Sequence, residues 1–381
     1  MDTRTGLPVV GMVGGGQLAR MTHQAAIALG QSLHVLAVSA DDGAALVAAE
    51  TQVGHHTDLE ALRAFADGCD VLTFDHEHVP GPLIRALQAD GFTVRPSAEA
   101  LRYAQDKRAM RERLGQLGLP IPRWRPVRST SEVAEFAEEV GWPVIGKAVR
   151  GGYDGRGVWS LGTVDAVGAL LAGGVDLIVE EHVQLRRELA ALVARSPFGQ
   201  VAVYPVVETV QQNGICVEVL APAPDLDDDV AVQAQQLAID IATALDVVGV
   251  LAVELFETDD GLVVNELAMR PHNSGHWTIE GARTSQFEQH LRAVLDYPMG
   301  ETALTAPAVA MANVLGGEPG GMGIDERLHH LFAMDPGAKV HLYGKQVRPG
   351  RKIGHVTVLG TDMDEVRERA RRAARWLREG E

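Results

Sequence analysis

Two apolar segments of this 381-residue chain are each interrupted by a glutamate, and a four-residue turn joins them. Glu254 interrupts the predicted strand Val250–Glu257, and Glu266 interrupts the predicted strand Leu262–Ala268. Because the turn Thr258–Gly261 is so short, the strands are predicted to be antiparallel neighbours with both carboxylates close together. Two buried carboxylates repel each other and are costly to desolvate unless a cation joins them. The pattern therefore favours a bound cation, and a salt-bridged structural pair is the alternative.

The chemistry of these side chains indicates which cation. With Asn265 beside Glu266, the hairpin offers two carboxylates and an amide oxygen. Oxygen ligands of this kind suit Mg²⁺ that bridges nucleotide phosphates. Phosphoryl transfer needs such a metal together with a lysine and a phosphate-binding loop, because most of its catalysis is positioning and neutralisation of charge.

A lysine and a glycine-rich segment with these properties lie earlier in the chain. Lys147 is the lone charge in the predicted strand Val144–Val149, and Gly151–Gly157 has four glycines in seven residues. Such a backbone bends closely around an oxyanion and leaves its N–H groups free to donate, while Lys147 and Arg156 add positive charge for triphosphate oxygens. A mobile hairpin turn is the alternative. It is the weaker one, because a lysine in an apolar strand precedes the glycines.

Two further segments suggest ligand contacts. The predicted strand Leu177–Glu181 ends on acids, and Glu180 would accept from an adenine amine or a ribose hydroxyl; an exposed strand end is the alternative. Directly after the second acidic strand, Arg270–His276 supplies a guanidinium, an imidazole and an amide. This combination suits a small planar anion such as bicarbonate or a carboxylate. His272 alone would more often be a packing residue.

The N-terminal glycine cluster is less specific. A predicted strand, Val9–Val13, leads into Gly14–Gly16 and then a helical pattern that ends at Gly30. A glycine turn at a helix N-terminus suits any phosphate, and the spacing also fits the dinucleotide fingerprint, with Asp41 after the second strand. An NAD-dependent oxidoreductase and a ligand-free tight turn both stay open on this motif.

The order of the elements predicts three domains. Strands alternate with helices over residues 1–120, which predicts a parallel, Rossmann-like α/β unit that ends at two prolines. Residues 121–300 are richer in strands, with a flexible lid at about 121–190, and residues 301–381 form a small β-rich domain. The predicted N-terminal strands after the first are Leu33–Val38, Val71–Phe74 and Phe92–Arg95, with helices at Asp58–Ala66 and Pro82–Ala89. Beyond them, predicted strands are Val158–Leu161, Leu189–Ala194, Val201–Val207, Ala308–Val314 and Ile353–Leu359, with few helices in the central part, and predicted helices are Asp229–Leu245 and Asp364–Glu379.

Composition excludes several classes of protein. The net charge of −17 argues against general nucleic-acid binding, although small phosphorylated ligands need only a local positive site. The N-terminus has no long apolar core of a signal peptide, and no uncharged apolar run reaches the roughly 18 residues that span a bilayer. Cys69 and Cys216 have no metal-binding spacing and are interpreted as reduced thiols. A soluble, cytoplasmic protein without membrane contact is expected.

With these residues in place, the chain resembles the ATP-grasp superfamily, and within it the 5-(carboxyamino)imidazole ribonucleotide synthases. The resemblance covers nearly the whole chain, from Gly11–Leu18 to His355. Gly151–Gly157 and the two metal acids are common to ATP-grasp enzymes. The His272–Trp277 run and the basic segment Lys345–Lys352 single out the carboxylase.

The resemblance implies a substrate and a role for each matching residue. The implied reaction is carboxylation of aminoimidazole ribonucleotide with ATP and bicarbonate, by a homodimer. Bicarbonate would contact Arg270, His272 and Asn273, which with Lys147 are the implied catalytic residues, and Mg²⁺ would bind Glu254 and Glu266. Residues implied to bind ATP are Lys107, Lys147, Gly152, Tyr153, Asp154, Gly155, Arg156, Gly157, Val158, Glu180, Glu181, His182, Val183, Glu188, Gln211, Asn265 and Glu266. Residues implied to bind aminoimidazole ribonucleotide are Gly16, Gln17, Leu18, Glu77, Tyr153, Lys345, Arg348 and Arg351.

Three positions depart from the family pattern. Lys107 stands where many relatives have arginine, which keeps the charge and loses bidentate geometry. Gln211 stands where some relatives have histidine, and His78 stands where asparagine is frequent. These departures concern single contacts and leave the reaction class unchanged.

The implied mechanism has two steps. Bicarbonate attacks the γ-phosphate of ATP to give carboxyphosphate and ADP, and the 5-amino group of the nucleotide then captures the carboxyl group, by way of CO₂. Closure of the glycine loop would exclude water that destroys the intermediate. Another ATP-grasp ligase, such as a formate-dependent glycinamide ribonucleotide transformylase, is the nearest alternative, and Asn273–Trp277 distinguishes the two. A non-catalytic nucleotide-binding subunit is a further alternative, with little reason to keep both acids and Lys147.

Overall fold

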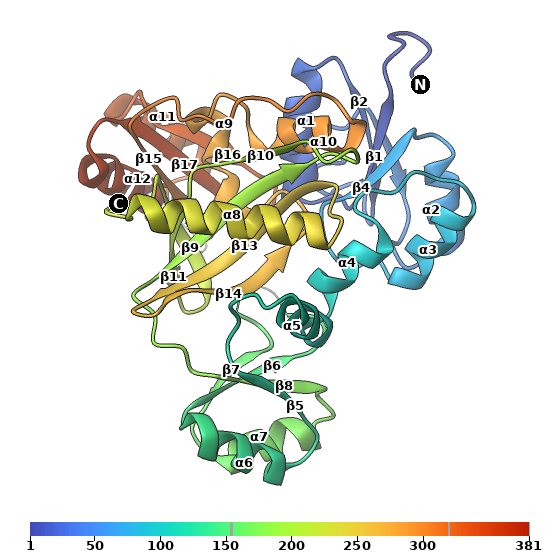
Figure 1. Ribbon diagram of the computed structural model, residues 1–381. Helices are drawn as coiled ribbons and strands as arrows, with labels where there is room; N and C mark the ends of the chain where they lie inside the picture. Colours follow the sequence, from blue (N-terminus) through green and yellow to red (C-terminus); the bar gives the residue numbers. More distant parts are fainter. Residues whose placement is uncertain (153–154, 319–320, 381) are drawn as a thin grey trace.

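The computed structural model describes residues 1–152, 155–318 and 321–380, and its strands form three sheets. Figure 1 shows the arrangement: the N-terminal sheet lies at one side, a large sheet occupies the centre, and a smaller sheet with two helices projects below it. Tyr153 and Asp154, both implied ligand contacts, lie outside the described residues. Within the described ranges no helix is long and apolar enough to cross a membrane.

The N-terminal part is a parallel sheet in the order β3-β2-β1-β4, as the alternation of strands and helices predicts. Its central strand β1 is buried along its whole length, because neighbouring strands pair with it on both sides. The strands are β1 (Val9–Val13), β2 (Ser32–Ala37), β3 (Glu50–Val53) and β4 (Val71–Phe74). The helices are α1 (Gln17–Ala28), α2 (Leu59–Ala66), α3 (Gly81–Ala89), α4 (Ala98–Gln105) and α5 (Lys107–Gln116).

One predicted strand of this sheet was wrong. Phe92–Arg95 forms only a single bridge, in which Val94 pairs with Leu72. Pro96 follows at once and has no N–H to donate, so the pairing cannot continue. The fourth strand is instead β3, which lies at the sheet edge and is polar and partly exposed. An edge strand without an apolar run gives no signal of the kind used to predict the others.

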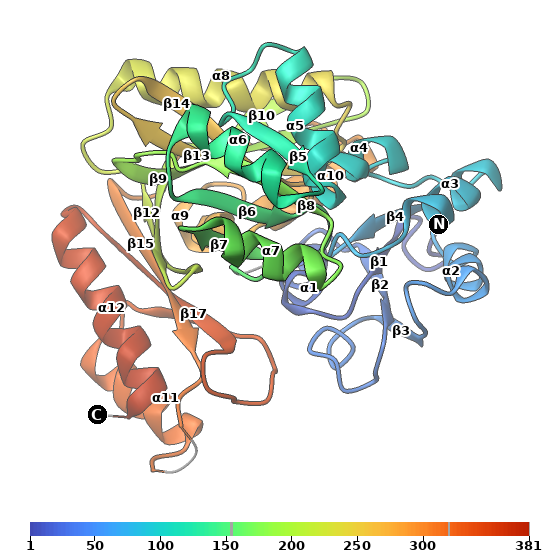
Figure 2. The same ribbon diagram turned by 90° about the horizontal axis from the view of Figure 1, so that it is seen from below.

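The projecting unit is a four-stranded sheet in the order β5-β8-β6-β7, with every pair antiparallel. Two helices pack their apolar side chains against it, and Figure 2 shows them from below. Few helices were expected in this part of the chain, so both were missed. The elements are β5 (Trp124–Val127), α6 (Thr130–Val140), β6 (Val144–Ala148), β7 (Val158–Leu161), α7 (Val164–Ala172) and β8 (Leu177–Glu181).

The central sheet runs in the order β14-β13-β9-β11-β12-β15-β17-β16, and β10 pairs with β9 beside this path. Strand β12 pairs with β15, so the sheet continues without a break from residues 187–268 into residues 308–360. Its strands are β9 (Arg187–Arg195), β10 (Val201–Val203), β11 (Val207–Gln212), β12 (Ile215–Ala221), β13 (Gly249–Thr258), β14 (Gly261–Ala268), β15 (Ala308–Leu315), β16 (Lys339–Leu342) and β17 (Lys352–Gly360). The helices are α8 (Asp228–Ala244), η1 (Asn273–Gly275, a 3₁₀ turn), α9 (Thr278–Gly281), α10 (Gln286–Leu295), α11 (Ile324–Met334) and α12 (Met363–Glu379).

Most predicted elements of this part agree with the structure. The acid-bearing hairpin, the strands near Ala308 and Ile353 and the two long helices are confirmed within a few residues. The predicted strand Val201–Val207 is two strands, β10 and β11, that pair with different parts of β9. Pro205 lies between them and cannot donate to a ladder, which explains the interruption.

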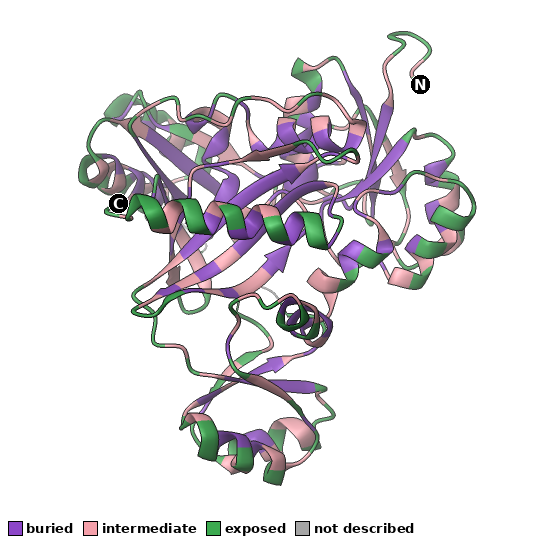
Figure 3. Cartoon of the chain, viewed as in Figure 1, coloured by how far each residue is buried: buried purple, intermediate pink, exposed green. Residues whose placement is uncertain are grey.

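Helix α8 covers one face of the central sheet. Ala234, Leu237, Ala238 and Ile241 recur at helical spacing on one side and are buried, whereas the opposite side faces solvent, as Figure 3 shows. The buried side packs in the same apolar cluster as Leu251 and Val253 of β13. The strand that carries Glu254 is therefore held rigidly from behind.

A buried histidine joins the N-terminal sheet to the central one. His290 of α10 is fully buried, its Nε2 lies 2.7 Å from the Thr73 hydroxyl, and its Nδ1 accepts from the Val250 N–H at 3.1 Å. Because Nδ1 accepts, the proton lies on Nε2 and the ring is neutral. Burial lowers the pKa of His290 from 6.5 to about 4.

This pKa predicts acid sensitivity. The unfolded chain takes up a proton at His290 below about pH 6.5, whereas the folded chain resists it down to about pH 4. Stability is therefore lost as the pH falls through that interval, by up to about 3 kcal/mol from this residue. We expect His290→Gln to flatten the fall of the unfolding free energy between pH 6.5 and 4, measured by urea titration. His329→Gln, at an exposed site, is the control; an equal slope in both variants would contradict the assignment.

Candidate active site

The two acids that interrupt the hairpin lie opposite each other. Glu254 of β13 and Glu266 of β14 are direct cross-strand partners, with an irregularity in register just after Glu254. Lys107 donates to Glu266 at 2.7 Å, and the His272 ring lies 3.4 Å from Glu254. The predicted proximity of the carboxylates is confirmed. Each also has a protein partner, which the sequence did not indicate.

The electrostatics of the pair are asymmetric. Burial and the neighbouring Glu266 and Glu188 raise the pKa of Glu254 to about 7. Burial also acts to raise the pKa of Glu266, but the Lys107 ammonium outweighs it and holds that pKa below its usual value. One carboxylate is thus neutralised by a lysine, and the other is short of positive charge.

This arrangement fits Mg²⁺ bound with a nucleotide. Among the described residues no three histidine, cysteine or carboxylate side chains gather as a metal site, and this hairpin offers two carboxylates. Mg²⁺ characteristically takes one or two carboxylates and completes its shell with water and substrate phosphates. The charge deficit at Glu254 is the observation that a cation would relieve.

Beside the acids, a second cluster is fully buried. Lys147 lies 2.8 Å from a Glu180 oxygen and donates to the Asn265 side-chain oxygen at 3.0 Å. Arg111 of α5 binds both Glu180 oxygens, at 2.7 and 3.1 Å, and donates to two backbone carbonyls of β14. Although burial alone would raise it, the pKa of Glu180 falls to about 2 because of Lys147 and Arg111. Lys147, the lone charge in its strand, is therefore paired with a carboxylate.

One of the two interpretations of Glu180 is excluded. Glu180 is 2% exposed, so it is not an exposed strand end. Its oxygens already accept from two cations, and a contact with adenine or ribose stays a prediction. Arg111, which organises the cluster, was missed in the sequence because it lies in a helix rich in other charges.

The glycine-rich segment has the backbone that its composition predicts. Four glycines of this segment have a positive φ between 71° and 95°, a region that residues with a side chain rarely adopt: Gly151, Gly152, Gly155 and Gly157. Gly155 lies against Gly214, so that a Cβ there would come within 3.1 Å of its backbone. The segment thus reaches the turn between β11 and β12.

Other residues implied to bind ATP follow β8 or line β9 and β11. Glu188 is partly buried and hydrogen bonded by Gln211, and burial raises its pKa. Glu181 accepts from the Arg123 side chain at 2.7 Å. His182 contacts Gln184, and Val183 lies between them in the connection to β9.

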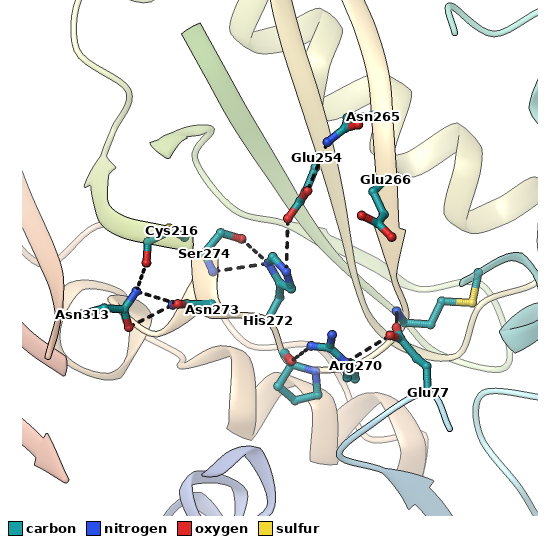
Figure 4. A network of polar contacts seen from close by, with 12 residues as sticks. Glu77, Cys216, Glu254, Asn265, Glu266, Arg270, His272, Asn273, Ser274 and Asn313 are labelled. Carbon is teal, nitrogen blue, oxygen red and sulfur yellow. Dashed lines mark hydrogen bonds and ion pairs between the residues drawn. The ribbon is translucent and has the colours of Figure 1, made fainter. Parts of the chain in front are cut away.

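The run Arg270–His276 after β14, which was predicted to bind an anion and is called the anion loop below, is seen in Figure 4. Arg270 lies 3.4 Å from Glu77, and Glu77 also accepts from the Met269 N–H at 2.8 Å. His272 contacts the Ser274 hydroxyl at 2.8 Å. Burial, reinforced by Arg270, lowers the pKa of His272 to about 3, so its ring is neutral. The structure brings this loop to the acid pair through the contact of His272 with Glu254.

The Asn273 side chain pairs with an asparagine in the C-terminal part of the chain. Its amide exchanges two hydrogen bonds with Asn313 of β15, at 2.7 and 3.2 Å. Asn313 was not identified from the sequence, because a lone asparagine in the apolar strand Ala308–Leu315 has no motif around it.

The N-terminal glycine cluster is closed by an acid from β4. Gly16 donates to Asp75 at 2.6 Å, and a Cβ on Gly14 would collide with the same carboxylate. Burial raises the pKa of Asp75 to about 6. Asp75 was not identified from the sequence, because no motif surrounds it.

The basic C-terminal segment meets this cluster. Lys345 donates to the Gln17 side chain, although 328 residues separate them in sequence. Arg348 and Arg351 are exposed on the same segment, and Leu18 is buried behind Gln17. Residues implied to bind one nucleotide are thus brought together from both ends of the chain.

Comparison with known families covers most of the chain. Residues 7–105 match the ribonucleotide synthetase preATP-grasp domain, residues 112–287 the ATP-grasp domain, and residues 309–369 the phosphoribosylaminoimidazole carboxylase C-terminal domain. This order agrees with the predicted fold class, an ATP-grasp fold between an N-terminal α/β unit and a C-terminal unit.

Similar proteins point the same way. The N5-carboxyaminoimidazole ribonucleotide synthase of Mycobacterium tuberculosis is 62% identical over 98% of this chain and 88% of its own length. The enzyme of that name from Corynebacterium ammoniagenes is 48% identical over 98% and 92%. The Thermus thermophilus synthetase structure has a TM-score of 0.87 at 39% identity, covering 96% of this chain and 98% of that one. An Aspergillus clavatus synthase, solved with ADP and 5-aminoimidazole ribonucleotide, has 0.86 at 33%, covering 97% and 98%.

The buried cluster makes a testable prediction about stability. Removal of one partner from a buried charge network leaves the others unpaired, which costs about 3–5 kcal/mol. We expect Arg111→Met to lower the free energy of unfolding by about that amount, measured by denaturant titration. Arg63→Met, which removes exposed ion pairs with Glu60 and Asp90, should cost less than the change at Arg111, because exposed pairs contribute about 0–1 kcal/mol each. Equal losses in the two variants would show that Arg111 does not support the cluster.

Proposed function

This chain belongs to the N5-carboxyaminoimidazole ribonucleotide synthase family of ATP-grasp enzymes, and we propose that bicarbonate and Mg²⁺ join ATP at its acid pair. Its reaction is the ATP-dependent carboxylation of aminoimidazole ribonucleotide in purine biosynthesis, and the enzyme is an ADP-forming ligase. The single observation that carries the proposal is the cross-strand pair of Glu254 and Glu266 beside Lys147 and the anion loop.

Lys147, Lys107 and the glycine loop are proposed to hold the triphosphate. Glu254 and Glu266 would hold Mg²⁺, which when bound neutralises phosphate charge. Because Lys107 now pairs with Glu266, arrival of a cation would free its ammonium for a phosphate oxygen. Burial lowers the pKa of Lys147, and the Glu180 carboxylate opposes this shift and orients the ammonium. Arg111 fixes that carboxylate from the other side.

Bicarbonate is proposed to lie at Arg270, His272 and Asn273. Glu77 holds the Arg270 guanidinium on one side, and the neutral His272 ring is oriented by Ser274. A guanidinium and an amide present N–H groups to a planar anion, which suits bicarbonate. Attack of its oxygen on the γ-phosphate would form carboxyphosphate and release ADP.

Aminoimidazole ribonucleotide is proposed to lie between the N-terminal glycines and the basic C-terminal segment. The contact of Lys345 with Gln17 closes this region from two sides, and exposed Arg348 and Arg351 offer charge for a 5′-phosphate. The amine of the nucleotide would take the carboxyl group and lose a proton, while phosphate leaves. A homodimer in the cytoplasm is part of the proposal and is supported by family resemblance.

The proposal predicts a dependence on both co-substrates. We expect ADP release to require bicarbonate together with aminoimidazole ribonucleotide, and formate not to replace bicarbonate. A coupled ADP assay in CO₂-depleted buffer measures this. ADP release that is indifferent to bicarbonate, or supported by formate, would remove the proposed anion.

Glu266→Gln provides the matched test of the acid pair. The amide keeps the size of the side chain but removes its charge, so turnover is expected to fall below detection while the melting temperature stays within a few degrees. Glu60→Gln, in an exposed ion pair with Arg63, should leave both quantities unchanged. Retained turnover in Glu266→Gln would take this residue out of the metal site.

A further inference from the structure

Asn313 is a buried polar residue that the proposed reaction does not use. It lies in β15, within the region that matches the C-terminal domain, and is 6% exposed. Its side chain makes hydrogen bonds to Cys216 and Asn273, which Figure 4 shows. An asparagine in an otherwise apolar buried strand is costly unless its amide is hydrogen bonded.

The Cys216 carbonyl fixes which way the Asn313 amide points. A backbone carbonyl can only accept, so the atom 2.9 Å away from it must be Nδ2 of Asn313. The other hydrogen of that nitrogen then points to Asn273 Oδ1, at 2.7 Å. Asn313 Oδ1 is left to accept from Asn273 Nδ2, at 3.2 Å.

The same logic fixes Asn273. Its Oδ1 faces a donor and its Nδ2 faces an acceptor. Rotation of the Asn273 amide by 180° would therefore set donor against donor and acceptor against acceptor. One N–H of Asn273 remains after this pairing, because an amide nitrogen has two. That N–H belongs to the residue of η1 that follows His272, on the anion loop.

We propose that Asn313 is a positioning residue, which orients Asn273 so that its remaining N–H faces bicarbonate. This rests on the proposed function, since it assumes that the anion at the loop is bicarbonate. The C-terminal part of the chain thereby sets bicarbonate affinity through a chain of three groups, the Cys216 carbonyl, Asn313 and Asn273. It does so without contact between Asn313 and the substrate.

Asn313→Asp tests the orientation directly. The carboxylate keeps the shape but has no N–H, so it repels the Cys216 carbonyl. It also no longer fixes the Asn273 amide, because either orientation of that amide sets its Oδ1 against a carboxylate oxygen. Loss of one hydrogen bond to an anion corresponds to about a tenfold change. We expect the KM for bicarbonate to rise at least about tenfold, with the KM for ATP within twofold of the parent enzyme.

A double-mutant cycle separates positioning from a general structural effect. If Asn313 acts through Asn273, then Asn313→Asp combined with Asn273→Ala should bind bicarbonate no worse than Asn273→Ala alone. Additive effects in the cycle, or an unchanged KM for bicarbonate in Asn313→Asp, would overturn the proposal. If the aspartate variant does not fold, Asn313→Ser replaces it in the cycle, because the serine side chain is too short to reach Asn273. The same criteria apply to it.

Thr357→Val is the matched control. Thr357 lies on the neighbouring strand β17, is fully buried, and its hydroxyl has no hydrogen-bond partner among the described residues. Its removal should leave the KM for bicarbonate unchanged; a rise equal to that of Asn313→Asp would assign the effect to the sheet and overturn the proposal. If the parent enzyme itself did not depend on bicarbonate, the proposed function would be refuted. This result distinguishes failure of the proposed function from failure of the positioning role of Asn313.

Discussion

The structure depends on how a few buried charges are balanced around one hairpin. Arg111 and Lys147 neutralise Glu180, and Lys107 neutralises Glu266, so three cations meet two carboxylates. Glu254 adds a third carboxylate whose nearest partner is a neutral histidine. A charged carboxylate in that position is unfavourable in the protein without ligand. It becomes useful when a cation and a highly charged nucleotide enter together, because both then find complementary charge already in place.

This balance draws on all parts of the chain. Arg111 and Lys107 come from the helix that follows the N-terminal unit, Lys147 and Glu180 from the projecting sheet, and the acid pair from the central sheet. The anion loop is held from the C-terminal side by Asn313. Because each unit supplies part of one charge network, movement of the projecting sheet would alter the site directly.

Much of the site could be predicted from sequence, because its residues occur in local patterns. A short turn between two acid-bearing strands predicts that Glu254 and Glu266 are opposite each other, and four clustered glycines predict a backbone with positive φ. Arg111, Asp75 and Asn313 were missed, since each contributes through contacts with residues distant in sequence. The same reason explains the fold errors: strand β3 is identified by its pairing with β2 and has no apolar pattern of its own.

The central claim is that a divalent cation binds between Glu254 and Glu266. A crystal of the enzyme grown with ADP and Mn²⁺ in place of Mg²⁺ tests it most directly, because the metal is located by its anomalous scattering. We expect an anomalous peak within coordination distance of both carboxylates, with Lys107 displaced from Glu266. A complex with ordered ADP, no peak at that place and the Lys107 ion pair intact would contradict it.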